Sequence, residues 1–151
     1  MGTSIEVESP GSPAARRVIA ELEAELDPLY PDESQHGYSV DKLISEGVAF
    51  FLVRYGGEEV GCGGIQLFGS EYGELKRMYI RPPYRGLGLG RQLIDRLIEH
   101  ARLHGVSVLR LETGIHQDEA IRLYERMGFR QIPPFPPYQP DPLSLFYQLV
   151  L

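Results

Sequence analysis

The hydrophobic positions of the chain follow a helical period in four segments. In the clearest of them, apolar residues that begin at Leu89 recur at spacings of three and four until Gly105, a residue type that commonly ends a helix. A later segment is closed in the same way by Gly128, and an earlier one has Pro13 in its first turn, where a missing N–H is tolerated. The pattern predicts helices over residues 13–26, 38–45, 89–105 and 117–127.

Between these segments the pattern is that of β-strands. Residues 48–55 are apolar on both faces, Gly56 and Gly57 supply a turn, and residues 59–68 follow, which together predict a β-hairpin. After a turn at 71–73, residues 74–80 predict a third antiparallel strand. Further strands are predicted over residues 4–7, 106–112 and 144–151. The order of elements predicts a mixed sheet covered by helices, as one domain over residues 1–151.

The composition is that of an ordinary water-soluble globular protein. Hydrophobic residues make up 42% and charged residues 24% of the chain, which excludes a disordered or fibrous protein. No stretch approaches the ~18 apolar residues of a membrane span. Cys62 is the single cysteine, which excludes an internal disulfide and a cysteine-based metal cluster. We therefore expect a cytoplasmic protein with no membrane partner and no metal.

The charge is distributed unevenly along the chain. The net charge is −6, and residues 1–75 carry 4 basic and 14 acidic groups. In residues 76–110 the balance reverses to 8 basic and 2 acidic groups. The acidic total and the acidic first half argue against a nucleic-acid partner. The basic middle segment, in contrast, indicates that an anionic ligand is held there.

A glycine-rich turn lies inside this basic segment, between a predicted strand and a predicted helix. Residues 85–90 read Arg-Gly-Leu-Gly-Leu-Gly, so the backbone can approach a ligand closely and the unpaired N–H groups of the helix start can bind a phosphate. Arg81, Arg85 and Arg91 could add charged contacts. The spacing is neither the G-x-G-x-x-G of dinucleotide folds nor a P-loop. The alternative is a tight turn that packing alone requires.

Two segments resemble the motifs of the GNAT family of N-acetyltransferases. Residues 74–90 resemble the family's acetyl-CoA motif, whose signature Gln/Arg-x-x-Gly-x-Gly/Ala is filled by Arg85, Gly88 and Gly90. Residues 120–129 resemble a second motif, although Gln117 stands where the family usually has Asn. The resemblance implies the α/β (α+β) GNAT fold, with a mixed, mostly antiparallel sheet of six to seven strands flanked by about four helices. It also implies acetyl transfer from acetyl-CoA.

The resemblance assigns the cofactor site to the glycine loop and the strand before it. It places the CoA pyrophosphate on the N–H groups of the loop with Arg85 beside it, and the pantetheine arm along the backbone of Met78 and Ile80, like an added strand. The thioester would lie where residues 74–80 and 106–112 diverge. The implied cofactor-binding residues are Met78, Tyr79, Ile80, Arg85, Gly86, Leu87, Gly88, Leu89, Gly90, Arg91, Gln117 and Tyr124.

The resemblance also supplies a candidate acid and a candidate base. Tyr124 matches the family's tyrosine that protonates the leaving thiolate, and a phenol with a pKa of ~10 is protonated at pH 7. Glu74 is the first candidate for the base, because some family members carry a catalytic Glu at this offset before the loop. The alternative for Glu74 is an ion pair with Lys76 on the same face of the strand. Lesser candidates are Glu112, Asp32 and Glu33.

The acceptor is the least specified part of the site. Cys62 lies in an apolar strand, so we expect direct attack by an amine rather than a covalent acetyl-enzyme. The first two helices and the proline-rich loop before the last strand would shape the pocket, and the candidate acceptor-binding residues are Tyr30, Glu33, His36, His116, Phe135 and Tyr138. The expected acceptor is a primary amine of a small molecule or of an amino acid or peptide.

The sequence also leaves open a specific acceptor and a different function. Residues 31–34, 112–116 and 141–144 resemble a branch of small bacterial acetyltransferases named for indole-3-acetate, but no other feature selects an indole. The alternative function is a non-catalytic CoA-binding sensor or interaction module that has kept the phosphate loop. Dimers are common in the family, so a homodimer is compatible with the resemblance.

Overall fold

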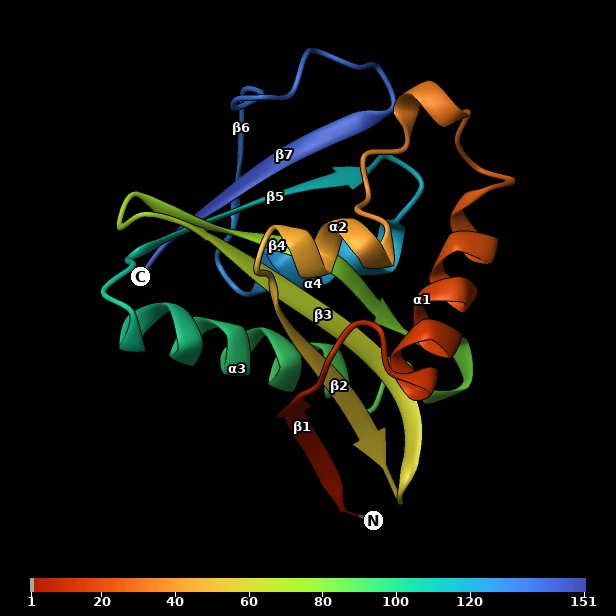
Figure 1. The fold of residues 1–151 in the computed structure, drawn as a ribbon. Helices are drawn as coiled ribbons and strands as arrows, with labels where there is room; N and C mark the ends of the chain where they lie inside the picture. Colours follow the sequence, from red (N-terminus) through yellow and green to blue (C-terminus); the bar gives the residue numbers. More distant parts are fainter. Residues whose placement is uncertain (1) are drawn as a thin grey trace.

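The computed structural model describes residues 2–151, which form one seven-stranded sheet with helices on both faces (Figure 1). The strand order is β1-β2-β3-β4-β5-β7-β6, and all neighbours are antiparallel except β4 and β5. The strands are β1 Thr3–Val7, β2 Ala49–Tyr55, β3 Glu58–Phe68, β4 Tyr72–Ile80, β5 Val108–Gly114, β6 Arg130–Ile132 and β7 Ser144–Val150. The helices are α1 Pro13–Leu26, α2 Val40–Ser45, α3 Leu89–Leu103 and α4 Asp118–Arg126, with 3-10 turns at Asp32–Ser34 and Pro82–Tyr84.

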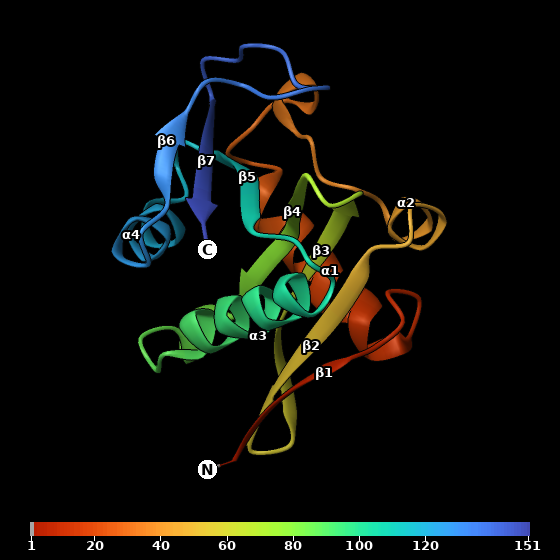
Figure 2. The ribbon, with the colours of Figure 1, turned by 90° about the vertical axis from the view of Figure 1, so that its left-hand side faces the viewer.

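The helices bury two apolar layers against the two faces of the sheet. On one face, Leu93 and Leu97 of α3 and Tyr124 of α4 pack with Leu109 and Leu111 of β5. On the other face, α1 and α2 pack on β2 and β3; Figure 2 shows the sheet between these two sets of helices. No helix within residues 2–151 is long and apolar enough to cross a membrane.

Helix α1 begins and ends where its sequence predicts. The Ser12 hydroxyl accepts a hydrogen bond from the N–H of Ala15 at 3.0 Å, and Pro13 occupies the first helical position. Val18, Ile19 and Leu22 recur at helical spacing and are buried against the sheet. Because the opposite side of α1 stays polar, the helix presents a row of carboxylates along its length.

The structure corrects the sequence-based bounds at several strands. Strand β5 lies two residues later than the predicted 106–112, because Val106 is still in the connection from α3 and Gly114 continues the pairing with Ser144. Strand β4 begins at Tyr72 rather than at 74, since Tyr72 pairs with Phe68 across the turn. The short strand β6 was not resolved by the pattern, because it has three residues and no alternation. The second helix begins at Val40, where the Ser39 hydroxyl caps it.

Strands β3 and β4 approach each other so closely that only glycine fits at position 61. A Cβ at Gly61 would lie 2.5 Å from the Tyr79 carbonyl oxygen, which is backbone and has little room to move. We expect Gly61→Ala to lower the free energy of unfolding by about 1–3 kcal/mol, measured by urea denaturation. Glu59→Ala on the same strand is the control, because its ion pair with Arg17 is on the surface. Equal stability of the two variants would contradict the close approach.

Candidate active site

The site is formed where β4 and β5 separate. These strands pair at only two positions, Gly73 with Leu109 and Glu74 with Arg110, and then diverge (Figure 1). On its other edge β4 contains a bulge: Cys62 pairs with Tyr79 but Gly64 pairs with Lys76, so β4 has one extra residue. Within the bulge Arg77 adopts a φ of 55°. The unpaired edge of β4 beyond Glu74 therefore faces an opening between the two strands.

A cavity of about 160 Å³ occupies this opening. Its walls come from both diverging strands, from α1, from the segment that follows the first 3-10 turn, and from α4. Its lining includes Glu23, His36, Arg77, Met78, Glu112 and Tyr124. The opening where the family resemblance places the thioester is therefore a cavity lined by ionisable groups.

The glycine loop presents a row of free backbone donors beside α3. Gly86 has a φ of 83° and Gly88 a φ of 80°, the latter at the N-cap of α3. None of the hydrogen bonds formed among residues 2–151 uses the N–H groups of residues 86–91. A Cβ at Gly86 or Gly88 would meet nothing within 4 Å, so both face open space. Leu89 of the predicted cofactor set has its side chain buried in the core, so only its backbone can contribute there, whereas Leu87 is exposed.

The arginines that flank the loop are already paired. Arg81 makes two hydrogen bonds of 2.7 and 2.6 Å to the carboxylate of Glu21 on α1. Arg85 donates to the Ile80 carbonyl oxygen at 2.8 Å and to Glu25 at 2.7 Å. The basic segment is therefore balanced in large part by α1, and its charge does not by itself indicate an anionic ligand. Arg91 is exposed at the start of α3.

Tyr124 lies at the cavity with its hydroxyl free. The side chain is 4% exposed and packs against Phe129. No hydrogen bond among the described residues engages its hydroxyl, although the ring lines the cavity. Burial raises the pKa of Tyr124 well above the ordinary phenol value, and the carboxylate of Glu112 adds to this shift. The phenol is therefore protonated at neutral pH.

Glu112 is the carboxylate that lines the same cavity. It points from β5 towards the side of the sheet covered by α1, and burial raises its pKa above the ordinary value for glutamate. The neighbouring Ser144 hydroxyl and His36 oppose this shift. A carboxylate with a raised pKa is a stronger base than a solvated one, so Glu112 is better suited to accept a proton than its sequence context indicated.

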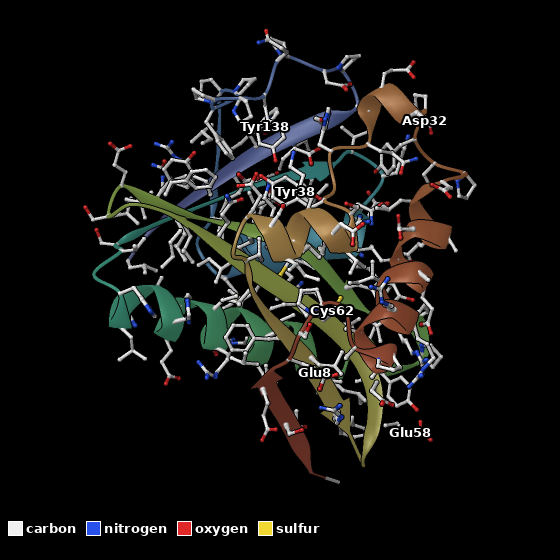
Figure 3. The ribbon with its side chains drawn as sticks, viewed as in Figure 1. Glu8, Asp32, Tyr38, Glu58, Cys62 and Tyr138 are labelled. Carbon is white, nitrogen blue, oxygen red and sulfur yellow. The ribbon has the colours of Figure 1, made fainter. Side chains whose placement is uncertain are left out.

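Glu74 is held in a different environment from the one expected of a base. It is 1% exposed, forms an ion pair of 2.8 Å with Lys76, and accepts a hydrogen bond from the Tyr138 hydroxyl. The Lys76 ammonium also lies 3.8 Å from the centre of the Tyr38 ring, and Figure 3 shows Tyr38 and Tyr138 on this side of the sheet. Glu74 is not among the residues that line the cavity. Its surroundings match the alternative of a pair with Lys76.

The candidate acceptor residues fall into two groups. Tyr30 lines the cavity, donates a hydrogen bond to the Gln117 side chain at 3.2 Å and accepts one from the His116 N–H at 2.9 Å. Its ring lies on Gly114, where any Cβ would overlap it. His36 also lines the cavity, 3.5 Å from Asp141. Tyr30, His36 and Gln117 therefore line the same cavity as Tyr124.

The second group of candidates lies beside the cavity rather than in it. Phe135 and Tyr138 of the proline-rich loop pack edge-to-face on each other, and the Tyr138 hydroxyl contacts both members of the buried Glu74–Lys76 pair. Glu33 and His116 are exposed and do not line the cavity. Sequence reasoning also missed Arg77, because strict alternation along β4 would put it on the face opposite Lys76.

Cys62, His100 and His104 do not line the cavity. Cys62 is fully buried, its thiol donates to the Arg77 carbonyl oxygen, and burial raises its pKa to about 12. Such a thiol is a poor nucleophile at neutral pH. The rings of His100 and His104 lie 4.4 Å apart on α3, and residues 2–151 contain no group of three or more side chains placed to bind a metal ion.

Comparison with known proteins agrees with the fold and the expected family. The sequence model of the Acetyltransferase (GNAT) family matches residues 16–129. A protein of Azospirillum brasilense named IAA acetyltransferase is 43% identical over 146 residues, which cover 96% of this chain and 95% of the relative. A solved structure from Klebsiella pneumoniae, assigned as an acyl-CoA N-acyltransferase, is 41% identical with a TM-score of 0.84, covering 99% of this chain and 97% of that one.

A more distant structure shares the fold alone. The GNAT acetyltransferase of Elizabethkingia anophelis, solved with acetyl-CoA bound, superposes with a TM-score of 0.73 at 19% identity, covering 99% of this chain. The predicted family, the predicted sheet-and-helix fold and the predicted acyltransferase class are confirmed. Because the family model covers most of the chain and a relative matches it at 43% identity over nearly its whole length, the chain belongs to the acetyltransferase (GNAT) family.

Proposed function

We propose that the protein transfers the acetyl group of acetyl-CoA directly to a primary amine of a small molecule. The observation that carries the proposal is the cavity between β4 and β5, where a protonated phenol, Tyr124, and a carboxylate of raised pKa, Glu112, line the same space. Two titratable groups whose environments keep one protonated and the other basic are typical of an acid–base pair. A module that only senses CoA needs neither group.

The free N–H groups of residues 86–91 fit the phosphates of CoA. They follow one another around two glycines of positive φ and meet open space, which is the arrangement that binds anions at a helix start. The unpaired edge of β4 near Met78 fits an extended arm with amide groups, which can pair with it as a strand would. The bound thioester supplies an activated acetyl group. Arg85 contributes its backbone, since its guanidinium is bound to Glu25.

Glu112 takes the proton that the acceptor amine must lose. An alkyl ammonium with a pKa of ~10.4 costs about 4–5 kcal/mol to deprotonate at pH 7. Glu112 is half-buried at the cavity wall, and its raised pKa reduces this cost when the proton moves to it or to a water molecule between them. Direct attack by the neutral amine then forms the C–N bond as the C–S bond breaks.

Tyr124 supplies the proton that the departing sulfur requires. Its hydroxyl has no partner among the described residues, and burial keeps it protonated at neutral pH. Donation to the thiolate leaves CoA as the neutral thiol. The proton released by the amine to Glu112 balances the one given by Tyr124, so the protein returns to its starting state after exchange with solvent.

Acetyl-CoA binding at the glycine loop is tested by thermal unfolding of matched glycine variants. A ligand at ~100 times its Kd stabilises a fold by about 2.7 kcal/mol, which we expect for the wild type. Gly86→Ala adds a Cβ where the phosphates would lie, and Gly57→Ala adds one at a hairpin with a φ of 84° against 83° at Gly86. Both variants lose comparable stability without ligand, since the backbone strain is the same.

The two variants should differ only in their response to acetyl-CoA. We expect Gly86→Ala to weaken binding by about tenfold or more and Gly57→Ala to leave it unchanged. An unchanged melting temperature of the wild type at saturating acetyl-CoA would refute the cofactor assignment. Equal affinity of the two variants for acetyl-CoA would instead mean that the phosphates do not bind at the loop.

The identity of the acceptor is an extension of this proposal. The relative from Azospirillum brasilense is named for IAA as its acceptor. Indole-3-acetate therefore belongs in the acceptor panel beside amines, amino acids and peptides. A primary amine is the acceptor class that the acid and base described above can serve.

A further inference from the structure

Arg77 carries a buried charge whose partner among the described residues is the exposed carboxylate of Glu23. Its side chain is 6% exposed, and its nearest carboxylate oxygen is that of Glu23 at 3.3 Å. None of the side-chain hydrogen bonds formed within residues 2–151 is donated by its guanidinium, and its Nε is buried without a partner. Burial lowers the pKa of Arg77, yet a guanidinium stays charged in proteins. A buried guanidinium with five N–H donors, one contact to Glu23 and an unpartnered Nε has donors left for a partner that is not part of the chain.

The backbone brings Arg77 to this position at a cost. The bulge in β4 turns Arg77 to the face of the sheet that carries Lys76 and Tyr79, and its φ of 55° is rare for a residue with a side chain. Gly37 passes directly over the guanidinium, where a Cβ would overlap it. Strained backbone of this kind occurs mostly at functional sites, where the surrounding structure maintains it.

The guanidinium lines the same cavity as the acid and the base. Arg77 comes from the β4 wall, whereas Glu112 and Tyr124 come from β5 and α4. Glu112 attracts an ammonium group before it takes a proton from it, and Arg77 offers a positive site on another wall of the cavity. The cavity thus contains one group for each charge of a molecule that has both an amine and a carboxylate.

We propose that the acetyl acceptor is a small amine that also carries a carboxylate, such as an amino acid, and that Arg77 binds this carboxylate. The inference rests on the proposed function and specifies its substrate class. A guanidinium matches a carboxylate with two parallel N–H donors. Glu23 occupies one side of the guanidinium in the free protein, and its side chain is 52% exposed, so it can move into solvent when the substrate carboxylate arrives.

Wild-type protein tests the inference without any variant. Acetylation is compared for matched compounds that share one side chain: an α-amino acid, its carboxamide, and the amine without the carboxyl group. We expect kcat/KM for the amino acid to exceed that for the carboxamide and for the carboxyl-free amine by at least tenfold. A compound without the carboxylate leaves the buried Arg77 charge without this partner, which weakens binding of that compound. Equal rates for the acid and the amide would overturn the inference and leave the proposed function intact.

The role of Arg77 is tested by Arg77→Gln and Arg77→Lys, with Arg96→Gln as the control. Arg96 is half-buried and lies on α3 over the Phe51 ring, on the other face of the sheet. We expect Arg77→Gln to raise KM for the amino acid at least tenfold while KM for the carboxyl-free amine stays constant. Arg77→Lys should recover part of the loss, and Arg96→Gln should change neither value.

Three outcomes would overturn the inference in different ways. Preference for the acid that persists in Arg77→Gln would mean that another group binds the carboxylate. An equal loss for acid and amine would make Arg77 a structural anchor for α1 through Glu23. Acetylation of none of the compounds, with acetyl-CoA bound, would refute the proposed function together with the inference.

Discussion

Replacing Tyr124 by Phe is expected to lower kcat by roughly 100- to 1,000-fold, the usual contribution of a positioned general acid. The Phe ring keeps the packing against Phe129 and loses only the hydroxyl, which has no partner among the described residues. The affinity for acetyl-CoA and the free energy of unfolding should therefore change little. Steady-state kinetics and a binding titration on the same variant separate the two effects.

Tyr147→Phe is the matched control for Tyr124→Phe. Tyr147 is also buried, and its hydroxyl donates to Glu125 at 3.1 Å, outside the cavity. We expect it to lose up to about 1 kcal/mol of stability and to keep its kcat. If Tyr124→Phe retained the wild-type kcat, the sulfur would be protonated by another group, and the acid role of Tyr124 would be wrong.

Replacing Glu112 by Gln is expected to lower kcat/KM by roughly 100-fold and to change the pH profile. A base must be deprotonated to act, so the wild-type rate falls as the pH drops through the raised pKa of Glu112. Gln does not titrate, so this limb of the profile disappears in the variant. The pH dependence of kcat/KM at constant ionic strength measures it.

The raised pKa of Glu112 also predicts how the difference in stability between the wild type and Glu112→Gln depends on pH. Burial favours the protonated carboxyl of Glu112 in the folded state, so the stability linked to this group is present at low pH and is lost as the pH rises through the folded pKa. Unfolding free energies should therefore shift in favour of Glu112→Gln as the pH increases. A difference independent of pH would mean that the Glu112 pKa is not raised.

Glu74→Gln distinguishes the two carboxylates. Glu74 pairs with a buried Lys76, and removal of one partner of a buried pair costs about 3–5 kcal/mol. We expect this variant to be unstable but to keep the shape of the wild-type pH profile. If instead Glu74→Gln lost the acid limb and Glu112→Gln kept it, Glu74 would be the base, as the sequence first indicated.

Local signals in the sequence identified those parts of the fold and site that depend on near neighbours. Ser12, Pro13 and the apolar spacing of α1 fix that helix within its own residues. The glycines at 86 and 88 mark a turn with positive φ, a conformation that glycine adopts most readily. Tyr124 was identified because its helix carries a recognisable motif, and its position in the cavity follows from the packing of α4 on the sheet.

Features that depend on distant contacts were not predictable from the chain. Arg81 and Arg85 lie sixty residues from their partners Glu21 and Glu25. The sequence pattern therefore suggested that the two arginines bind an anionic ligand, whereas in the structure they pair with carboxylates of α1. Alternation along β4 fails at Arg77, because the bulge arises from the pairing with β3 and has no sequence signature. The environments of Glu74 and Glu112 differ through the loop that brings Tyr138 to Glu74.

The most direct test of acetyl transfer is the simultaneous measurement of free CoA thiol and of N-acetylated product, with acetyl-CoA and a panel of amines, amino acids and peptides. We predict that thiol and product form in equal amounts, in proportion to the protein, and that neither forms without an acceptor. Tight binding of acetyl-CoA with no product from any acceptor would contradict the proposal and would indicate a protein that binds CoA without turning it over.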